Sequence, residues 1–166
     1  FGSSTIVIAI ETIKQPDNTY LAYTDNGREY TGIDAISWAK EAQSRGAGEI
    51  LLTSIGQEGT GNGFDLNLIK RVSNLVTIPI IAHGGAANDS HIYEAINGSG
   101  ADAVAIASML HYAAINKIDS IVSNNNNEGN MEFLKKKGSF KMFGKENISE
   151  IKNQLNKQDI PLRILN

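Results

Sequence analysis

The sequence lacks cysteine, long apolar runs and a large excess of charge of either sign. Without cysteine, the chain can form neither disulfides nor thiolate metal sites. No apolar run approaches the ~18 residues of a membrane-spanning helix, so we expect a soluble, cytoplasmic protein with no membrane partner. The formal net charge of −3 argues against nucleic acid as a partner, although a phosphate pocket made of backbone amides would leave that charge unchanged.

The chain opens on Phe1-Gly2-Ser3-Ser4, without an initiator methionine or the charged and apolar regions of a signal peptide. This start predicts that the sequence is a fragment of a longer chain. With 41% hydrophobic and 20% charged residues, residues 1–166 are expected to form a single packed domain.

Strand-like and helix-like segments alternate along the first two thirds of the chain. Runs of apolar and β-branched residues predict buried strands at 5–10, 49–53, 78–82 and 103–107. The charged Glu11 is expected to end the first of these strands. Apolar residues at helical spacing predict helices around 36–42, 66–72 and 92–96.

Cap and turn residues agree with these segments. Asp34 is a candidate N-cap for the first helix, and Gly46 is expected to end it. Asp25-Asn26-Gly27 has the composition of a tight turn whose residues need positive φ, so residues 20–30 are expected to form a small hairpin.

Strict alternation of strand, loop and helix is typical of a parallel α/β fold. The four βα units amount to half of a TIM (β/α)₈ barrel, because a complete barrel needs ~250 residues. A half-barrel leaves its edge strands and the inward face of its sheet unpaired. We therefore expect the chain to associate with a second copy or with an amino-terminal half-barrel.

The alternation stops after Tyr112, where the sequence becomes polar and rich in asparagine. A mobile insertion is expected at about 113–146, since the stretch is longer than an ordinary loop. Order is expected to resume at Asn147, which with Glu150 resembles the capping box of a helix. The last apolar group, 160–165, is expected to pack down as a tail.

Three glycine-rich or small-residue turns follow consecutive strands, at the end of the sheet where parallel barrels hold their active sites. They are the loop 55–63, which holds four glycines, the pair Gly84-Gly85 and the pair Ala107-Ser108. Such turns let backbone amides converge on an anion. Any one of them is also explained by turn geometry alone, and their occurrence on consecutive strands favours a phosphate site.

Two ionisable side chains follow these strands. Glu11 is a candidate general acid or base, with a solvated rim carboxylate as the alternative. His83 could shuttle protons, but a lone histidine beside a glycine pair is more often a satisfied polar residue. The sequence predicts no metal and no cofactor.

Several long segments are similar to the cyclase subunit of imidazole glycerol phosphate synthase. They include 1–10, Gly46-Ala47-Gly48-Glu49 with its following strand, Glu58-Gly59-Thr60, and Gly84-Gly85-Ala86. The match extends to about Tyr112 and resumes at Ile148. A sister barrel, the phosphoribosyl isomerase, shares the glycine motifs but usually carries Thr-Asp where this chain has Thr53-Ser54, which favours the cyclase.

The resemblance implies the carboxy-terminal half of a ribulose-phosphate-binding barrel that acts in histidine biosynthesis. A glutaminase partner would supply ammonia, which the cyclase would join to a doubly phosphorylated substrate, releasing imidazole glycerol phosphate and the purine precursor AICAR. Glu11 would be catalytic and Glu49 would match a charged residue at the ammonia entrance. The fragment alone would be inactive. The resemblance implies the following residues for phosphate or substrate binding: Thr53, Glu58, Gly59, Gly84, Gly85, Ala107 and Ser108.

Four positions depart from the family pattern. Glu11 replaces an aspartate, Gly56 and Glu58 stand where the family usually has two aspartates, and His83 replaces a residue that is usually serine. These changes leave an alternative open, a paralogue that uses glutaminase-derived ammonia for amidination of a sugar nucleotide in surface polysaccharide synthesis. A third possibility, from another class, is a non-catalytic half-barrel that serves in binding or assembly.

Overall fold

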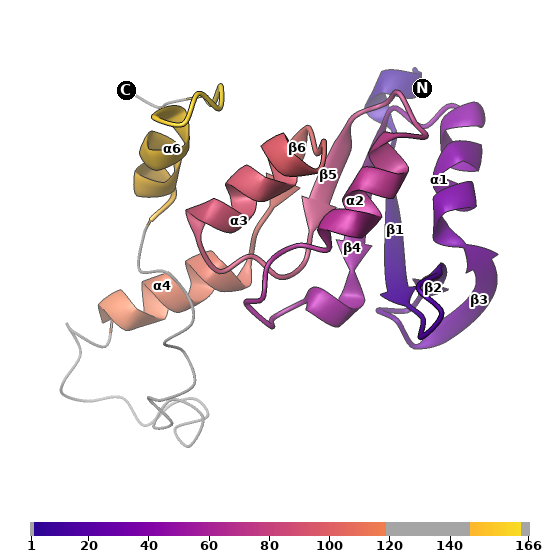
Figure 1. Ribbon diagram of the computed structural model, residues 1–166, viewed down its shortest axis with the longest axis horizontal. Coiled ribbons are helices and arrows are strands. Elements are labelled where there is room, and N and C mark those ends of the chain that lie inside the picture. Colours follow the sequence, from indigo (N-terminus) through magenta and orange to yellow (C-terminus); the bar gives the residue numbers. More distant parts are fainter. Residues whose placement is uncertain (1, 119–146, 164–166) are drawn as a thin grey trace.

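The computed structural model describes residues 2–118 and 147–163. Its strands form one sheet in the order β3-β2-β1-β4-β5-β6 (Figure 1). The parallel strands are β1 (Val7–Lys14), β4 (Glu49–Ser54), β5 (Ile80–His83) and β6 (Ala103–Ala105). The antiparallel strands are β2 (Tyr20–Thr24) and β3 (Glu29–Asp34), which form a hairpin beside β1. The parallel strands lie in sequence order, as successive βα units of a barrel do.

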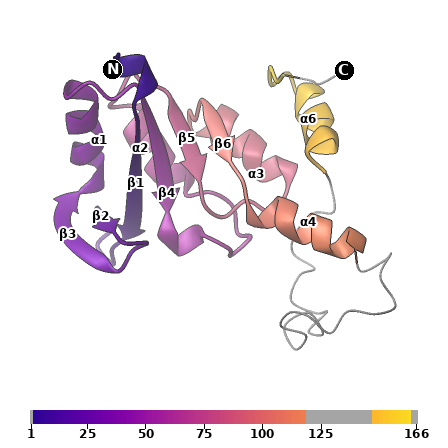
Figure 2. The same ribbon diagram turned by 180° about the vertical axis from the view of Figure 1, so that it is seen from behind.

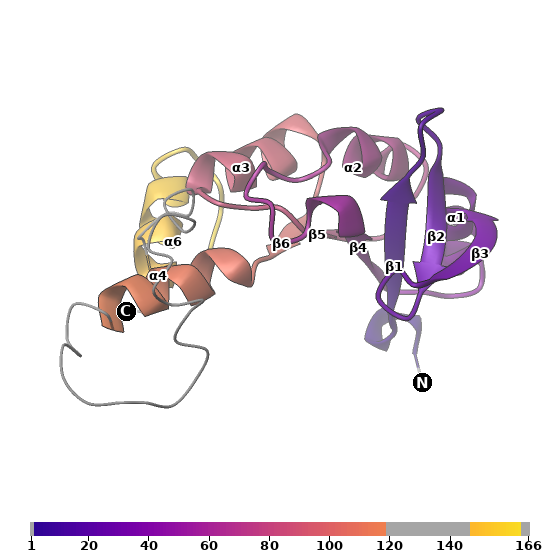
Figure 3. The ribbon, with the colours of Figure 1, turned by 90° about the horizontal axis from the view of Figure 1, so that it is seen from below.

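Helices connect the parallel strands. The α-helices are α1 (Ala35–Ser44), α2 (Leu66–Ser73), α3 (Asp89–Tyr93), α4 (Ser108–Ile118) and α6 (Ile148–Asn156). Shorter turns are η1 (Ser3–Thr5), η2 (Ile55–Gln57) and the π-helical η3 (Glu94–Gly98). Figure 3 shows α2 and α3 on one side of strands β4 to β6. The four parallel strands and the helices that follow them form the predicted half-barrel of four βα units. Among the described helices, none has the length and apolar composition of a membrane span.

The core lies between the helices and one face of the sheet. Ile50 and Leu52 of β4 are buried and pack with Leu68 and Val72 of α2. Leu51, between them in sequence, points to the opposite face and is only partly buried. Successive strand residues point to opposite faces, so the second face is the one that would line the interior of a closed barrel.

The first strand does not end at Glu11, contrary to the expectation from sequence. β1 continues to Lys14, because residues 11–14 pair with β2 on one side, and Glu11 and Thr12 also pair with β4 on the other. Glu11 itself lies opposite Tyr23 and Thr53. A charged residue does not end a strand when its backbone has partners on both sides. Glu11 is therefore held within the sheet.

The predicted hairpin is present, and Asp25 and Asn26 in its turn have the expected positive φ values of 52° and 55°. Tyr20 anchors the hairpin, since its hydroxyl donates a hydrogen bond of 2.9 Å to Oδ1 of Asp65. The same oxygen accepts from the backbone N–H of Leu68 and caps α2. Burial raises the pKa of Tyr20, and the bond to Asp65 raises it further. The hairpin is thus tied to the start of α2.

The described residues test part of what the sequence predicts for the carboxy-terminal region. Helix α4 covers residues 113–118 of the expected mobile insertion at 113–146, and residues 119–146 lie outside the described part of the chain. The capping box of Asn147 and Glu150 is confirmed at the start of α6. Ile160 is buried against this helix, as expected for the tail.

Candidate functional site

The strand registers bring three of the candidate polar residues into one row. Glu11 of β1 lies beside Thr53 of β4, Thr53 beside His83 of β5, and His83 beside Ala105 of β6. Residues paired across neighbouring strands share a face of the sheet. Since the residues next to them in sequence, such as Leu52, pack against the helices, this row lies on the inward face.

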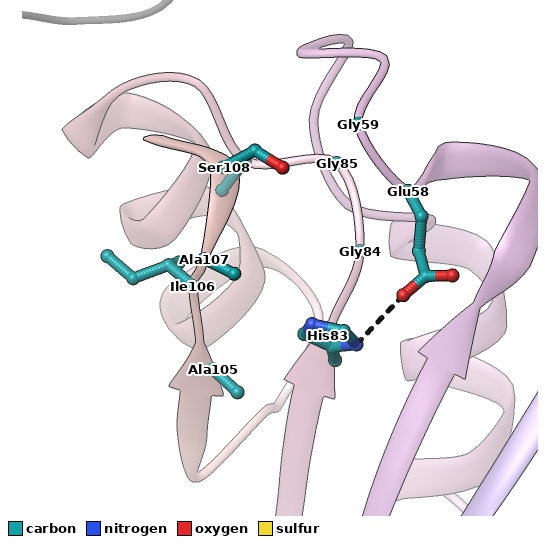
Figure 4. Close-up of a pocket in the computed structure, with 10 residues that line it drawn as sticks. Glu58, Gly59, His83, Gly84, Gly85, Ala105, Ile106, Ala107 and Ser108 are labelled. Carbon is teal, nitrogen blue, oxygen red and sulfur yellow. Dashed lines mark ion pairs between the residues drawn. The ribbon is translucent and has the colours of Figure 1, made fainter. Parts of the chain in front are cut away.

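A pocket of about 120 Å³ opens at the carboxyl ends of β4, β5 and β6 (Figure 4). It is lined by Glu58, Gly59, His83, Gly84, Gly85, Ala86, Ala105, Ile106, Ala107 and Ser108. Six of the seven residues expected to bind phosphate or substrate therefore line one cavity. The seventh, Thr53, does not line it but contacts His83.

Tight packing shapes the glycine pair of this pocket. Gly84 and Gly85 have φ values of +96° and +107°, which residues other than glycine rarely adopt. A Cβ on Gly85 would overlap the carbonyl oxygen of Gly63, whose N–H donates a 2.9 Å hydrogen bond to the Gly85 carbonyl. Gly59 also has a positive φ, +69°, but space around it is open. The turn after β5 therefore requires glycine for steric reasons as well as for conformation.

Helix α4 begins at the same pocket. The backbone N–H of His111 donates to the carbonyl of Ala107 at 3.0 Å, so the helical hydrogen bonds start there. The amides of the first turn have no partner within their own helix, and the helix dipole makes this end favourable for an anion. Ala107 and Ser108 thus add helix-terminal donors to the glycine turns, the combination by which such barrels bind phosphate.

His83 is held by two partners that the sequence did not indicate. Its Nδ1 lies 3.2 Å from Oγ1 of Thr53 and 3.5 Å from Oε1 of Glu58. The side chains of His83 and Glu58 are 27% and 46% exposed, so both reach solvent through the pocket. The contact with Thr53 follows from strand register, because both residues stand at the ends of neighbouring strands. The contact with Glu58 depends on the path of the loop after β4.

Glu11 lies apart from the pocket, two strands away along the same row. Its Oε2 is buried and has no hydrogen-bond partner among the described residues. Buried polar atoms are nearly always hydrogen-bonded, and an exception in a native protein needs an explanation such as a catalytic role. The carboxylate stands on the inward face, in the row that Thr53 and His83 continue.

Glu49 begins β4, at the end of the sheet opposite the pocket, and pairs with Val7. The side chains of residues 49, 51 and 53 alternate with the buried core residues, so Glu49 shares the inward face with Thr53. Within the described residues, no three His, Asp or Glu side chains converge as a ligand set for a metal ion.

The model of the histidine biosynthesis protein family matches residues 1–116. The imidazole glycerol phosphate synthase subunit HisF of Pyrobaculum aerophilum is 51% identical over 115 residues, 69% of this chain and 45% of that protein. The subunit of the same name from Bacillus licheniformis is 50% identical over 113 residues, 68% and 45% of the two chains. The subunit of the same name from a Nostoc species is 36% identical over 167 residues, which are 99% of this chain and 52% of that protein. The chain belongs to the histidine biosynthesis protein family and spans about half the length of the curated relatives it matches.

Proposed function

We propose that this chain is the carboxy-terminal half of a cyclase that joins ammonia to a doubly phosphorylated substrate and releases imidazole glycerol phosphate and AICAR. The observation that carries this proposal is the pocket of glycine turns and the α4 terminus, which shares the inward face with the unpartnered carboxylate of Glu11. The names of the similar proteins support the same reaction.

The substrate, phosphoribulosyl aminoimidazole carboxamide ribotide, has a phosphate at each end. The pocket binds one phosphate through the backbone amides around Gly59, Gly85 and Ser108. The rest of the substrate extends along the inward face toward Glu11. After ammonia attacks, ring closure needs proton transfers, and Glu11 acts as the general acid or base.

Two partners would complete the enzyme. A glutaminase subunit supplies ammonia at the end of the barrel that carries Glu49, remote from the phosphate pocket. An amino-terminal half-barrel supplies the other four βα units and the opposing catalytic carboxylate. We call this chain joined to such a half the assembled barrel.

The chain on its own should associate into dimers or larger species. Figure 2 shows β6 at the end of the row of parallel strands, and Ala103 of β6 and Val7 of β1 are exposed on the inward face. Open strand edges and apolar surface favour pairing. Sedimentation at micromolar concentration should show the association, and added amino-terminal half should replace it with one complex. A compact monomer with cooperative unfolding would contradict the half-barrel proposal.

The assembled barrel should form imidazole glycerol phosphate from added ammonia, and Ser108→Asp should raise KM for the substrate by about 10- to 100-fold. The new carboxylate would repel the phosphate by about 1–3 kcal/mol at the effective dielectric of a partly exposed site. Ser37→Asp in the first turn of α1, outside the pocket, is the matched control. An unchanged KM in the Ser108→Asp variant would contradict phosphate binding in this pocket.

A second candidate, amidination of a sugar nucleotide with the same ammonia source, is favoured by one observation. His83 and Glu58 form a contact inside the pocket at positions where related sequences usually carry serine and aspartate. The assembled barrel would then show no cyclase turnover while consuming ammonia with a nucleotide sugar.

A further inference from the structure

We propose that the pocket binds its anion together with one proton: His83, held by Glu58 and Thr53, is an imidazolium in the complex and supplies the positive charge that the pocket otherwise lacks. This inference rests on the proposed phosphate site and adds to it the charge state in which the site binds. The phosphate group bound is a dianion, and the proton comes from solvent.

The geometry gives each ring nitrogen a separate task. Nδ1 of His83 is within 3.2 Å of the Thr53 hydroxyl and 3.5 Å of the Glu58 carboxylate, and both can accept its hydrogen. Figure 4 shows the ring between Glu58 and the strand end that carries Ala105 and Ile106, with the second ring nitrogen on the side away from Glu58. When protonated, Nε2 is therefore a donor beside the cavity, with no partner among the described residues.

Such a donor would offset the negative charge in the pocket. Among the described residues that line it, only Glu58 and His83 can be charged, and no lysine or arginine is present. With a neutral imidazole, a bound dianion and the Glu58 carboxylate would repel each other, and only backbone dipoles would offset that repulsion. An imidazolium between the two anionic groups attracts both, because like charges disfavour and opposite charges favour the charged form of a neighbour.

Few other ionisable groups face His83. On β1, Glu11 stands in the same row but two strands away, and it adds to the negative charge on this face. On β4, the neighbour is the uncharged Thr53. On β6 and at the start of α4, the facing residues Ala105 and Ser108 carry no charge. Among the described residues, every charged neighbour of His83 is thus acidic, so none of them repels an imidazolium.

Sulfate is the probe for the test, because it stays a dianion across the range in which imidazole changes charge, about pH 5 to 8. We expect sulfate affinity for the assembled barrel to fall by roughly tenfold per pH unit where the free imidazole is neutral, the limit for one linked proton. Calorimetry at about pH 8 in two buffers of different ionisation enthalpy should show uptake of about one proton per sulfate.

His83→Gln keeps a hydrogen-bond donor but cannot titrate, so its sulfate affinity should be independent of pH and at least about tenfold weaker at pH 6. His111→Gln is the matched control, since His111 is exposed on α4 and does not line the pocket. It should keep the wild-type dependence on pH. Glu58→Gln should bind sulfate more tightly at pH 8 and depend less on pH, because the carboxylate no longer repels the anion.

Three results would overturn the inference, and they separate it from the proposed function. Equal sulfate affinity at pH 6 and pH 8 would contradict the linked proton but would be consistent with the phosphate site. A pH dependence that persists in His83→Gln assigns the proton to another group. Absence of sulfate and phosphate binding at every pH refutes the phosphate site itself. If His83→Gln does not fold, His83→Ser, the residue usual in related sequences, serves in its place.

Discussion

Glu11→Gln should lower kcat of the assembled barrel by about 10²- to 10⁴-fold while leaving KM within several-fold, the range that a positioned general acid or base supplies. The substitution keeps the size of the side chain and removes its proton-transfer chemistry. Affinity should persist, because the proposed phosphate pocket, two strands away, would supply most of the binding. Steady-state rates with added ammonia measure both parameters without a glutaminase.

The control is Glu29→Gln, the same change at an exposed position on β3, which should leave the rate unaltered. Undiminished turnover in Glu11→Gln, on whichever substrate proves correct, would make Glu11 a bystander. The buried Oε2 atom would then need another explanation.

Glu11→Asp separates the two candidate functions. In a histidine-pathway cyclase the aspartate variant should keep or raise activity, since it restores the family residue. A displacement of about 1 Å can cost on the order of a hundredfold in rate, so the difference of one methylene is measurable. In an enzyme rebuilt around glutamate for a sugar nucleotide, the wild type should show almost no cyclase turnover and the aspartate variant should not create it.

Gly85→Ala should destabilise the assembled barrel by at least about 3 kcal/mol more than Gly59→Ala, although both glycines belong to the same pocket. The two positions share a positive φ, so both variants carry backbone strain of about 1–3 kcal/mol. Only at Gly85 would the new Cβ also overlap a backbone carbonyl, that of Gly63, whose N–H is hydrogen-bonded to the Gly85 carbonyl. Space around Gly59 is open.

Chemical denaturation of both variants, with and without sulfate, measures this difference and its consequence for binding. Sulfate at a hundred times its dissociation constant should stabilise the wild type by ~2.7 kcal/mol, and Gly85→Ala should lose most of that gain. Equal stability of the two variants would show that the turn after β5 relaxes around a side chain. The steric argument for Gly85 would then fail, whatever the role of the pocket.

Several features of this protein could be predicted from its sequence because they depend on local chemistry. The alternation of apolar runs gave four strands and their helices, the turn Asp25-Asn26-Gly27 gave the hairpin, and Asn147 with Glu150 gave a capping box. The glycine turns after consecutive strands identified the pocket, because parallel strands present their carboxyl ends at one edge of the sheet.

Other features were decided only by tertiary structure. The sequence placed Glu11 at a strand end, and its position inside the sheet depends on pairing with β2, which no local pattern predicts. The row of Glu11, Thr53 and His83 is a consequence of strand register. The contact of His83 with Glu58 likewise joins residues from two different βα units. Local patterns report which residues prefer a strand or a turn, whereas register and loop path are set by packing between distant segments.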